Sequence, residues 1–256
     1  MLLAVDVGNT QTVIGVFKGD DLIQHWRIST NAAHTEDEIA LVFQGLLSFV
    51  DLSFTRNVHG VVISSVVPRL TESLRGMTER YFMFPPVVVE PGVTTGVAVR
   101  IDNPGEVAAD RIVNALAAYE LYGGPAIVVD FGTATSFDVV SKEGVFLGGA
   151  IAPGIATSVD ALASRTARLP NVEFATPRHV IGTNTVDALQ SGIVYGFAGQ
   201  VDGIVTRMRE VLGPGVTTVA TGGLAVAVVE ACTTIDHHDP WLTLKGLRII
   251  WDRNTV

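Results

Sequence analysis

The chain of 256 residues contains one cysteine, Cys232, so it cannot form an internal disulfide. Scarcity of cysteine is typical of proteins from a reducing compartment. Cys232 ends the apolar run Leu224–Cys232, which indicates a small buried hydrophobic side chain rather than a nucleophile.

Long hydrophobic runs are also missing. No stretch of roughly 18 or more apolar residues occurs, so we expect no transmembrane helix and no membrane partner. The N-terminus lacks a basic segment, and Asp6 interrupts its apolar residues, which argues against a secretory signal. The expected location is the cytoplasm.

Basic residues are few. The 17 Lys and Arg residues stand against 26 Asp and Glu residues, which gives a formal net charge of −9 and argues against a nucleic-acid partner. A glycine-rich turn can still bind a phosphate whatever the net charge. Hydrophobic residues make up 48% and charged residues 17% of the chain, which is enough for a sizeable core.

The pattern of apolar runs and turn residues predicts a repeated order of elements. In the first part we expect strands at Leu2–Val7, Thr12–Phe17, Leu22–Ser29 and Val58–Ser64, and helices over Thr35–Val50, Pro68–Tyr81 and Glu106–Leu121. In the second part we expect strands at Ala126–Asp130, Ser136–Val140, Val145–Ile151 and Thr217–Ala220, helices over Gly154–Ala163 and Thr185–Leu212, and one more helix opened by Gly222 and Gly223.

Each part therefore reads as a strand ending in aspartate, a glycine turn, two further strands and a helix. The repeat predicts an α/β protein with two related halves, residues 1–115 and 116–256, that face each other across a cleft. Each half is expected to hold a mixed sheet of about five strands, of which the first three are antiparallel.

The turn from Asp6 to Thr12 is the first candidate site. Gly8 lets the backbone approach a ligand, and the side chains of Asn9, Thr10 and Thr12 can hydrogen-bond phosphate oxygens. Asp6 lies at the carboxyl end of its strand, where it can hold Mg²⁺ directly or through water. The alternative is an ordinary hairpin turn, which has the same sequence pattern.

A second turn of the same pattern favours a phosphate site over an ordinary hairpin turn. Asp130, Gly132 and Thr133 repeat the pattern far along the chain, and two such turns can bind one nucleotide from both sides. A third segment, Thr221-Gly222-Gly223, follows a strand, and its glycines allow a base or ribose to lie against the backbone.

Asp110 and Arg111 are candidates for the reaction itself. A carboxylate such as Asp110 can accept a proton from a substrate hydroxyl, and a guanidinium such as Arg111 can pair with a carboxylate or a phosphoryl group. The alternative is a surface pair near a helix start. The tract Asp236–Asp239 has no spacing typical of a metal site.

These three turns together resemble the two phosphate motifs and the adenosine motif of the actin-like and sugar-kinase superfamily, whose halves have a ribonuclease H-like fold. The segments Asn103–Ile112 and Gly182–Gly192 resemble the substrate segments of type III pantothenate kinases, and Asp239–Leu247 is also similar to that family. The resemblance extends from Leu3 to Asn254.

The resemblance implies ATP-dependent phosphorylation of pantothenate to 4′-phosphopantothenate, the first step of coenzyme A biosynthesis, by a phosphotransferase that acts on an alcohol group. It implies Asp110 as the catalytic base, a homodimer, and Asp130 as a ligand of a monovalent cation, K⁺ or NH₄⁺, besides Mg²⁺ at Asp6. The implied substrate-binding residues are Ala108, Ala109, Asp110, Arg111 and Thr185, and the implied ATP- and phosphate-binding residues are Asp6, Gly8, Asn9, Thr10, Thr12, Gly132, Thr133, Gly222 and Gly223.

One position departs from the family pattern, which usually reads Gly-Ala-Asp-Arg where this chain has Ala108-Ala109-Asp110-Arg111. If that position needs a positive φ, alanine strains the loop. Ala108 is thus the feature that favours a non-catalytic nucleotide-binding regulator. Another small-molecule kinase or a phosphatase of the same superfold is the second alternative.

Overall fold

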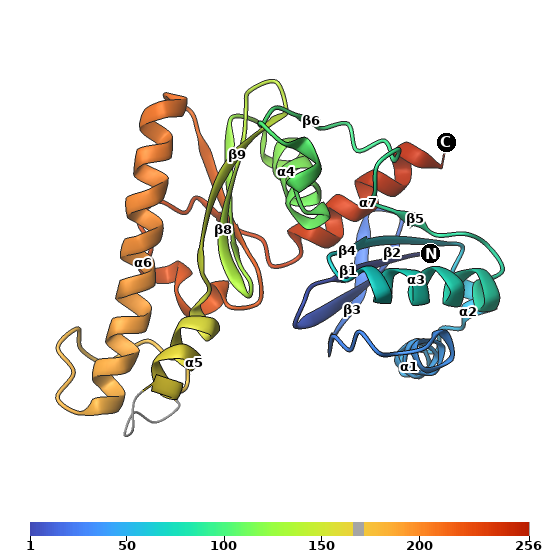
Figure 1. The fold of residues 1–256 in the computed structure, drawn as a ribbon, viewed down its shortest axis with the longest axis horizontal. Coiled ribbons are helices and arrows are strands. Elements are labelled where there is room, and N and C mark those ends of the chain that lie inside the picture. The colour runs from blue at the N-terminus through green and yellow to red at the C-terminus, as the bar shows by residue number, and fades with distance from the viewer. Residues whose placement is uncertain (166–171, 256) are drawn as a thin grey trace. The chain divides into compact units, whose positions relative to one another are not determined.

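The computed structural model describes residues 1–165 and 172–255 and contains two compact units, each of which is treated by itself (Figure 1). The first unit comprises Met1–Gly96, Gly105–Ala117 and Thr243–Val256, and the second comprises Val97–Pro104 and Ala118–Leu242. The division into two repeated halves, residues 1–115 and 116–256, remains a prediction from the sequence.

The first unit is built on a five-stranded mixed sheet in the order β3-β2-β1-β4-β5. The strand β1 pairs antiparallel with β2 and parallel with β4, and β2 pairs antiparallel with β3. The elements are β1 (Leu2–Val7), β2 (Gln11–Lys18), β3 (Asp21–Ser29), α1 (Glu36–Ser48), α2 (Phe54–Asn57), β4 (Gly60–Ser65), α3 (Pro68–Met77), the π-helix η1 (Thr78–Phe82) and β5 (Val87–Val88).

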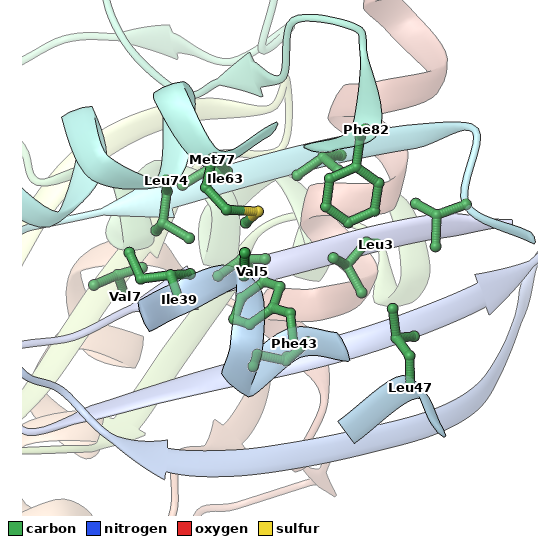
Figure 2. Packing of buried hydrophobic residues seen from close by; sticks show 14 of the residues in the cluster. Leu3, Val5, Val7, Ile39, Phe43, Leu47, Ile63, Leu74, Met77 and Phe82 are labelled. Atoms are coloured by element: carbon green, nitrogen blue, oxygen red, sulfur yellow. The ribbon is translucent and has the colours of Figure 1, made fainter. Parts of the chain in front are cut away.

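Helices cover both faces of this sheet, which explains why β1 and β4 are apolar along most of their length, up to Asp6 and Ser64 near their carboxyl ends. The face that carries Leu3, Val5 and Val7 packs against Ile39 and Phe43 of α1, as Figure 2 shows. Leu74 and Met77 of α3 join the same cluster (Figure 2).

The opposite face of β1 carries Leu2, Ala4 and Asp6, because side chains alternate along a strand. There α7 (Leu242–Asn254) lies so close that Trp251 fills the space beside Gly60, and Leu244 lies 2.8 Å from where a Cβ of Gly15 would be.

The second unit has a six-stranded mixed sheet in the order β11-β10-β7-β8-β9-β6. Its helices α5 and α6 contribute to the core on one face, where Ile155, Ile193 and Val201 join a buried cluster with the strands. The elements are β6 (Ala98–Val99), β7 (Ala126–Phe131), β8 (Ala134–Val140), β9 (Val145–Pro153), α5 (Ile155–Arg165), α6 (Thr185–Leu212), β10 (Thr217–Thr221), the short 3₁₀ turns η3 (Ala225–Ala227) and η4 (Val229–Ala231), and β11 (His237–His238).

The turn η2 (Pro104–Glu106) precedes α4 (Ala109–Tyr122), and the boundary between the units falls inside α4, after Ala117. None of the helices in the described part of the chain is long and apolar enough to cross a membrane.

The predicted α/β class and the two mixed sheets are confirmed, and the elements lie close to the expected ranges. The helix expected after Gly222 and Gly223 is wrong: only η3 and η4 form there. Val226, Val228 and Val229 explain the difference, because β-branched side chains lose rotamer freedom in a helix.

Candidate functional site

In the first unit, the candidate phosphate turn joins β1 to β2. The N–H of Gly8 donates to the carbonyl oxygen of Gln11 at 3.0 Å, which closes the turn. Asn9 and Thr10 at its tip are exposed. This arrangement leaves polar side chains at the end of a buried strand, as a phosphate site requires.

Thr30, which follows β3, braces this turn. Its N–H donates to the carbonyl oxygen of Thr10 at 2.9 Å, and its hydroxyl donates to the carbonyl oxygen of Gly8 at 2.8 Å. The hydroxyls of Thr12 and Thr30 lie 2.9 Å apart. Because the single hydroxyl proton of Thr30 is used at Gly8, Thr12 must donate to Thr30.

Thr12 therefore differs from the other predicted ligands of this turn. It is 3% exposed, and it lies opposite Val7 in the ladder, on the face that packs against α1 and α3. Asp6 points to the other face, since it precedes Val7 by one residue. The structure thus brings Asp6, Gly8, Asn9 and Thr10 to one strand end and buries Thr12 beneath it.

In the second unit, Asp130, Gly132 and Thr133 form the equivalent turn between β7 and β8. The N–H of Gly132 donates to the carbonyl oxygen of Ala134 at 3.0 Å. The carbonyl oxygen of Thr133 accepts from Gly154 N–H at 3.2 Å and from the hydroxyl of Thr157 at 2.8 Å. Residues that follow the third strand brace the turn in both units.

Gly222 brings the third motif to the same sheet edge. The strand β10 runs parallel to β7 with Thr221 opposite Asp130, so the two strand ends are neighbours. Gly222 has a φ of 94°, and a Cβ there would collide with the carboxylate of Asp130 and lie 2.6 Å from the backbone nitrogen of Phe131. Asp130, Gly132, Thr133, Gly222 and Gly223 therefore form one cluster, and only glycine fits at position 222.

Asp110 lies in the first turn of α4, within the first unit. Its Oδ1 accepts from the N–H of Arg111 at 2.8 Å. Burial raises the pKa of the Asp110 carboxyl, while the backbone N–H and the guanidinium of Arg111 oppose that shift. A raised pKa makes this carboxylate a better proton acceptor than an ordinary exposed aspartate.

Ala108 adopts an ordinary backbone conformation. Its carbonyl oxygen accepts from the N–H of Ile112 at 3.4 Å, which is the first helical bond of α4. Among the described residues other than glycine, positive φ values occur at Asp51 and Met83 and not at Ala108. The strain expected for alanine in place of the family's glycine is therefore absent.

Thr185 is exposed at the start of α6, in the second unit. Asn184 caps this helix, because its Oδ1 accepts from the N–H of Asp187 at 2.9 Å and its amide nitrogen donates to the Asp187 carboxylate at 2.8 Å. The cap fixes the backbone on which the Thr185 side chain stands.

The remaining polar candidates have structural partners. Burial raises the pKa of the Cys232 thiol to about 12, so the thiolate that a nucleophile needs is scarce. Asp236 accepts from Thr218 N–H at 2.8 Å. Asp239 is 4% exposed and accepts from the hydroxyl of Tyr122 at 3.0 Å.

Mg²⁺ needs few protein ligands, since it usually takes one or two carboxylates and completes its shell with phosphate oxygens and water. No group of three His, Cys, Asp or Glu side chains suited to a metal occurs in the described ranges. Asp6 at the end of β1 fits a Mg²⁺ site with a single protein carboxylate. The buried hydroxyl of Ser64 lies beside it on the adjoining strand β4.

Sequence reasoning missed the bracing residues Thr30, Gly154 and Thr157, and it missed Ser64. A signal was available for Thr30, which directly follows the predicted strand Leu22–Ser29, whereas Gly154 and Thr157 fall within the helix predicted over Gly154–Ala163. Nothing local marks Ser64, because its neighbour in space comes from a different part of the chain.

Two mixed sheets, each with an Asp-x-Gly turn at the end of its central strand, define the actin-like and sugar-kinase class of α/β proteins. Solved structures share this fold. A Baf-family transcriptional-activator candidate from Campylobacter jejuni is 20% identical with a TM-score of 0.63, and 98% of each chain is covered. An activator of 2-hydroxyisocaproyl-CoA dehydratase from Clostridium difficile, solved with ADPNP, has a TM-score of 0.56 at 13% identity, covering 98% of this chain and 94% of that chain.

Sequence comparison identifies the family. The model of the type III pantothenate kinase family matches residues 2–207. Proteins named type III pantothenate kinase are 58% identical in Acidothermus cellulolyticus, over 99% of both chains, and 57% identical in Thermobifida fusca, over 100% of both. The chain belongs to the type III pantothenate kinase family.

Proposed function

We propose that this chain transfers the γ-phosphate of ATP to the 4′-hydroxyl of pantothenate, which yields 4′-phosphopantothenate and ADP. This is the first step of coenzyme A biosynthesis. The observation that carries the proposal is membership of the type III pantothenate kinase family along essentially the full length of the chain. Two braced phosphate turns at the ends of β1 and β7 support it.

The phosphate turns are assigned to ATP. In the first unit, Gly8, Asn9 and Thr10 bind phosphate oxygens, and Thr12 holds the turn through Thr30. In the second unit, Gly132 and Thr133 bind phosphate oxygens, and Gly222 and Gly223 bind the adenosine. Asp6 holds Mg²⁺, which when bound neutralises charge on the β- and γ-phosphates.

Asp110 is assigned to the acceptor alcohol. The 4′-oxygen attacks the γ-phosphorus, the bond from that phosphorus to the bridging oxygen of ADP breaks, and the hydroxyl proton passes to the Asp110 carboxylate. Little base strength is needed if the transition state is loose, so orientation of the hydroxyl is the larger part of its role. The raised pKa of Asp110 is consistent with either part.

Arg111 and Thr185 are assigned to pantothenate, with Ala108 and Ala109 beside them. A guanidinium pairs with a carboxylate in a bidentate geometry, and pantothenate carries one carboxylate. Asp130 is assigned to K⁺ or NH₄⁺, which would offset the repulsion between this carboxylate and a phosphate.

A homodimer is proposed from the family resemblance. Large apolar side chains exposed in the second unit support a face covered by a second copy: Val180 and Ile181 are 64% and 79% exposed, and Tyr195 on α6 is 40% exposed. Light scattering at micromolar concentration tests this, and a monomer mass would contradict it.

The alternative of a non-catalytic regulator loses its support, because Ala108 has no positive φ. The alternative of another small-molecule kinase is tested with a panel of substrates. The test incubates the purified protein with ATP, MgCl₂ and KCl and detects phosphopantothenate by mass spectrometry, with other small alcohols in parallel. ATP binding without phosphorylation of pantothenate would overturn the proposal.

A further inference from the structure

Ser64 lies directly beside Asp6 in the first sheet. The strands β1 and β4 are parallel, with Asp6 opposite Ser64 and Val7 opposite Ser65 in their register. Residues opposite each other in a ladder point to the same face, so Ser64 shares the face of Asp6, which α7 covers further along the strands. Both lie at the carboxyl end of their strand.

The hydroxyl of Ser64 makes no hydrogen bond to the residues that the structure describes. Ser64 is 0% exposed, and its Oγ finds no hydrogen-bond partner in the described part of the chain. The next residue differs, because the Oγ of Ser65 accepts from Val67 N–H at 3.1 Å and from the Thr71 hydroxyl at 2.7 Å, at the start of α3. One serine supports a helix start, and the other is buried without a partner in the described ranges.

A buried hydroxyl without a partner lowers stability, so folding alone would favour alanine at position 64. The second unit repeats the placement of a buried hydroxyl residue beside the turn aspartate, since Thr221 of β10 lies opposite Asp130 of β7 in a parallel ladder and is 1% exposed. Each turn aspartate therefore has a buried hydroxyl residue beside it on the adjoining parallel strand. The repetition indicates a role connected with the aspartates.

We infer that Ser64 is a positioning residue for Asp6: its hydroxyl donates a hydrogen bond to the Asp6 carboxylate and fixes that side chain for Mg²⁺·ATP. Neighbouring strands lie about 4.8 Å apart, a gap that a serine hydroxyl and an aspartate carboxylate can bridge after rotation of the serine. A carboxylate has about four acceptor sites, so it can bind a metal and accept from Ser64 at once. The inference rests on the proposed role of Asp6 in ATP binding.

The test compares Ser64→Ala with Ser53→Ala. Ser53 is a matched control, because its Oγ is also buried without a partner in the described residues, while it lies near α2 and not beside an aspartate of the site. Isothermal titration calorimetry measures binding of the non-hydrolysable nucleotide AMPPNP over a series of Mg²⁺ concentrations, and a thermal melt measures stability. Ser64→Thr retains the hydroxyl, and Thr221 shows that the equivalent place in the second sheet takes a threonine.

Ser64→Ala should weaken Mg²⁺-dependent binding about tenfold, as loss of a group that orients a metal ligand typically does, while its melting temperature stays equal or rises. Ser53→Ala should leave binding unchanged, and Ser64→Thr should restore most of it. Unchanged binding by Ser64→Ala would overturn the inference, and so would an equal loss in Ser64→Thr. Wild-type protein that binds Mg²⁺·AMPPNP but does not phosphorylate pantothenate would refute the proposed function and leave this test intact.

Discussion

Thr30 donates its hydroxyl proton to the carbonyl oxygen of Gly8 at 2.8 Å, although 22 residues separate them in the chain. The bond ties the end of β3 to the turn after β1. In the second unit Gly154 is the equivalent of Thr30. Thr12 pairs with Ile28, and Thr30 lies two residues after Ile28. Thr135 pairs with Ala152, and Gly154 lies two residues after Ala152. A Cβ at Gly154 would collide with the Thr133 carbonyl.

The change from Thr30 in the first unit to Gly154 in the second alters the hydrogen bonding of a neighbouring threonine hydroxyl. Thr12 has Thr30 as its partner, whereas the buried hydroxyl of Thr135 has no partner among the described residues. The two halves keep the bracing backbone bond, from Thr30 to Thr10 and from Gly154 to Thr133, and differ in the side chains that reinforce it.

The first prediction concerns Thr30→Val. The change leaves the half-buried Gly8 carbonyl and the buried Thr12 hydroxyl without the Thr30 hydroxyl, and the loss at the buried Thr12 hydroxyl costs about 1–3 kcal/mol. We expect a lower free energy of unfolding in urea and a higher KM for ATP, because the phosphate turn loosens. Thr30→Ser is the control that keeps the hydroxyl, and it should stay close to wild type. Equal loss in both variants would mean that the methyl group matters instead.

Ala108→Gly tests whether this chain is impaired by its departure from the family pattern. Since Ala108 has an ordinary φ, glycine relieves no strain and adds freedom to the unfolded chain. We expect unchanged turnover and a stability change of about 1 kcal/mol or less. A clear gain in turnover would show that the loop takes a positive φ during the reaction.

Gly222→Ala should push the adenosine segment, which contains Gly222, away from the phosphate turn that begins at Asp130. The φ of 94° and the clash with Asp130 together imply a loss of about 2–5 kcal/mol in the free energy of unfolding, with weaker ATP binding. Gly45→Ala in α1 is the opposite control, because a Cβ there meets no described atom within 4 Å. That variant should gain about 0.5–1 kcal/mol. A neutral Gly222→Ala would contradict the fit described for this position.

Local signals explain which elements the sequence predicts well. Thr35 and Glu38 form the expected capping box, with Glu38 N–H donating to the Thr35 hydroxyl at 3.3 Å and Thr35 N–H donating to the Glu38 carboxylate at 2.8 Å. Strand β1 and helix α6 have the predicted bounds. Such features depend on residues close together in the chain.

Features that depend on distant residues were not predictable in this way. The helix α7 packs at Gly15 and Gly60 of the first sheet although it ends the chain, and β6 pairs with β9 in the second unit. The neighbours Asp6 and Ser64 meet only through the β1–β4 register. Each phosphate turn could be predicted as a motif, but the residues that brace it follow strands later in the chain and meet the turn only in the folded protein.

The cation prediction concerns Asp130, whose carboxylate adjoins Gly222 at the proposed phosphate site. Turnover should require K⁺ or NH₄⁺ and should fall when Na⁺ alone is present at equal ionic strength. The reason is that a bound cation offsets the repulsion between this carboxylate and the phosphates. Asp130→Asn should reduce the difference between the salts. Equal turnover of the wild type in all three salts would remove the cation role.

Asp110→Asn tests the proposed base. The change keeps the size of the side chain and an oxygen that can accept from Arg111 N–H, but it removes the charge and the proton acceptor. Turnover should fall about 10²–10⁴-fold, as removal of a general base typically does. Affinity for ATP should be retained, because Asp110 belongs to neither phosphate turn. Both quantities are measured on the same preparation, by a coupled assay and by calorimetry.

The pH dependence of stability tests the raised pKa of Asp110. Burial raises the pKa of Asp110 in the folded state, so the folded protein binds this proton more tightly than the unfolded chain does. Its contribution to stability is therefore complete below the unfolded pKa and is lost as the pH rises through the folded pKa. Asparagine carries no charge, so Asp110→Asn should become progressively more stable relative to wild type as the pH rises through this window, in thermal melts at a series of pH values. A variant that is inactive and also less stable than wild type at neutral pH would instead place Asp110 in the support of α4, and near-normal turnover would end its assignment as the base.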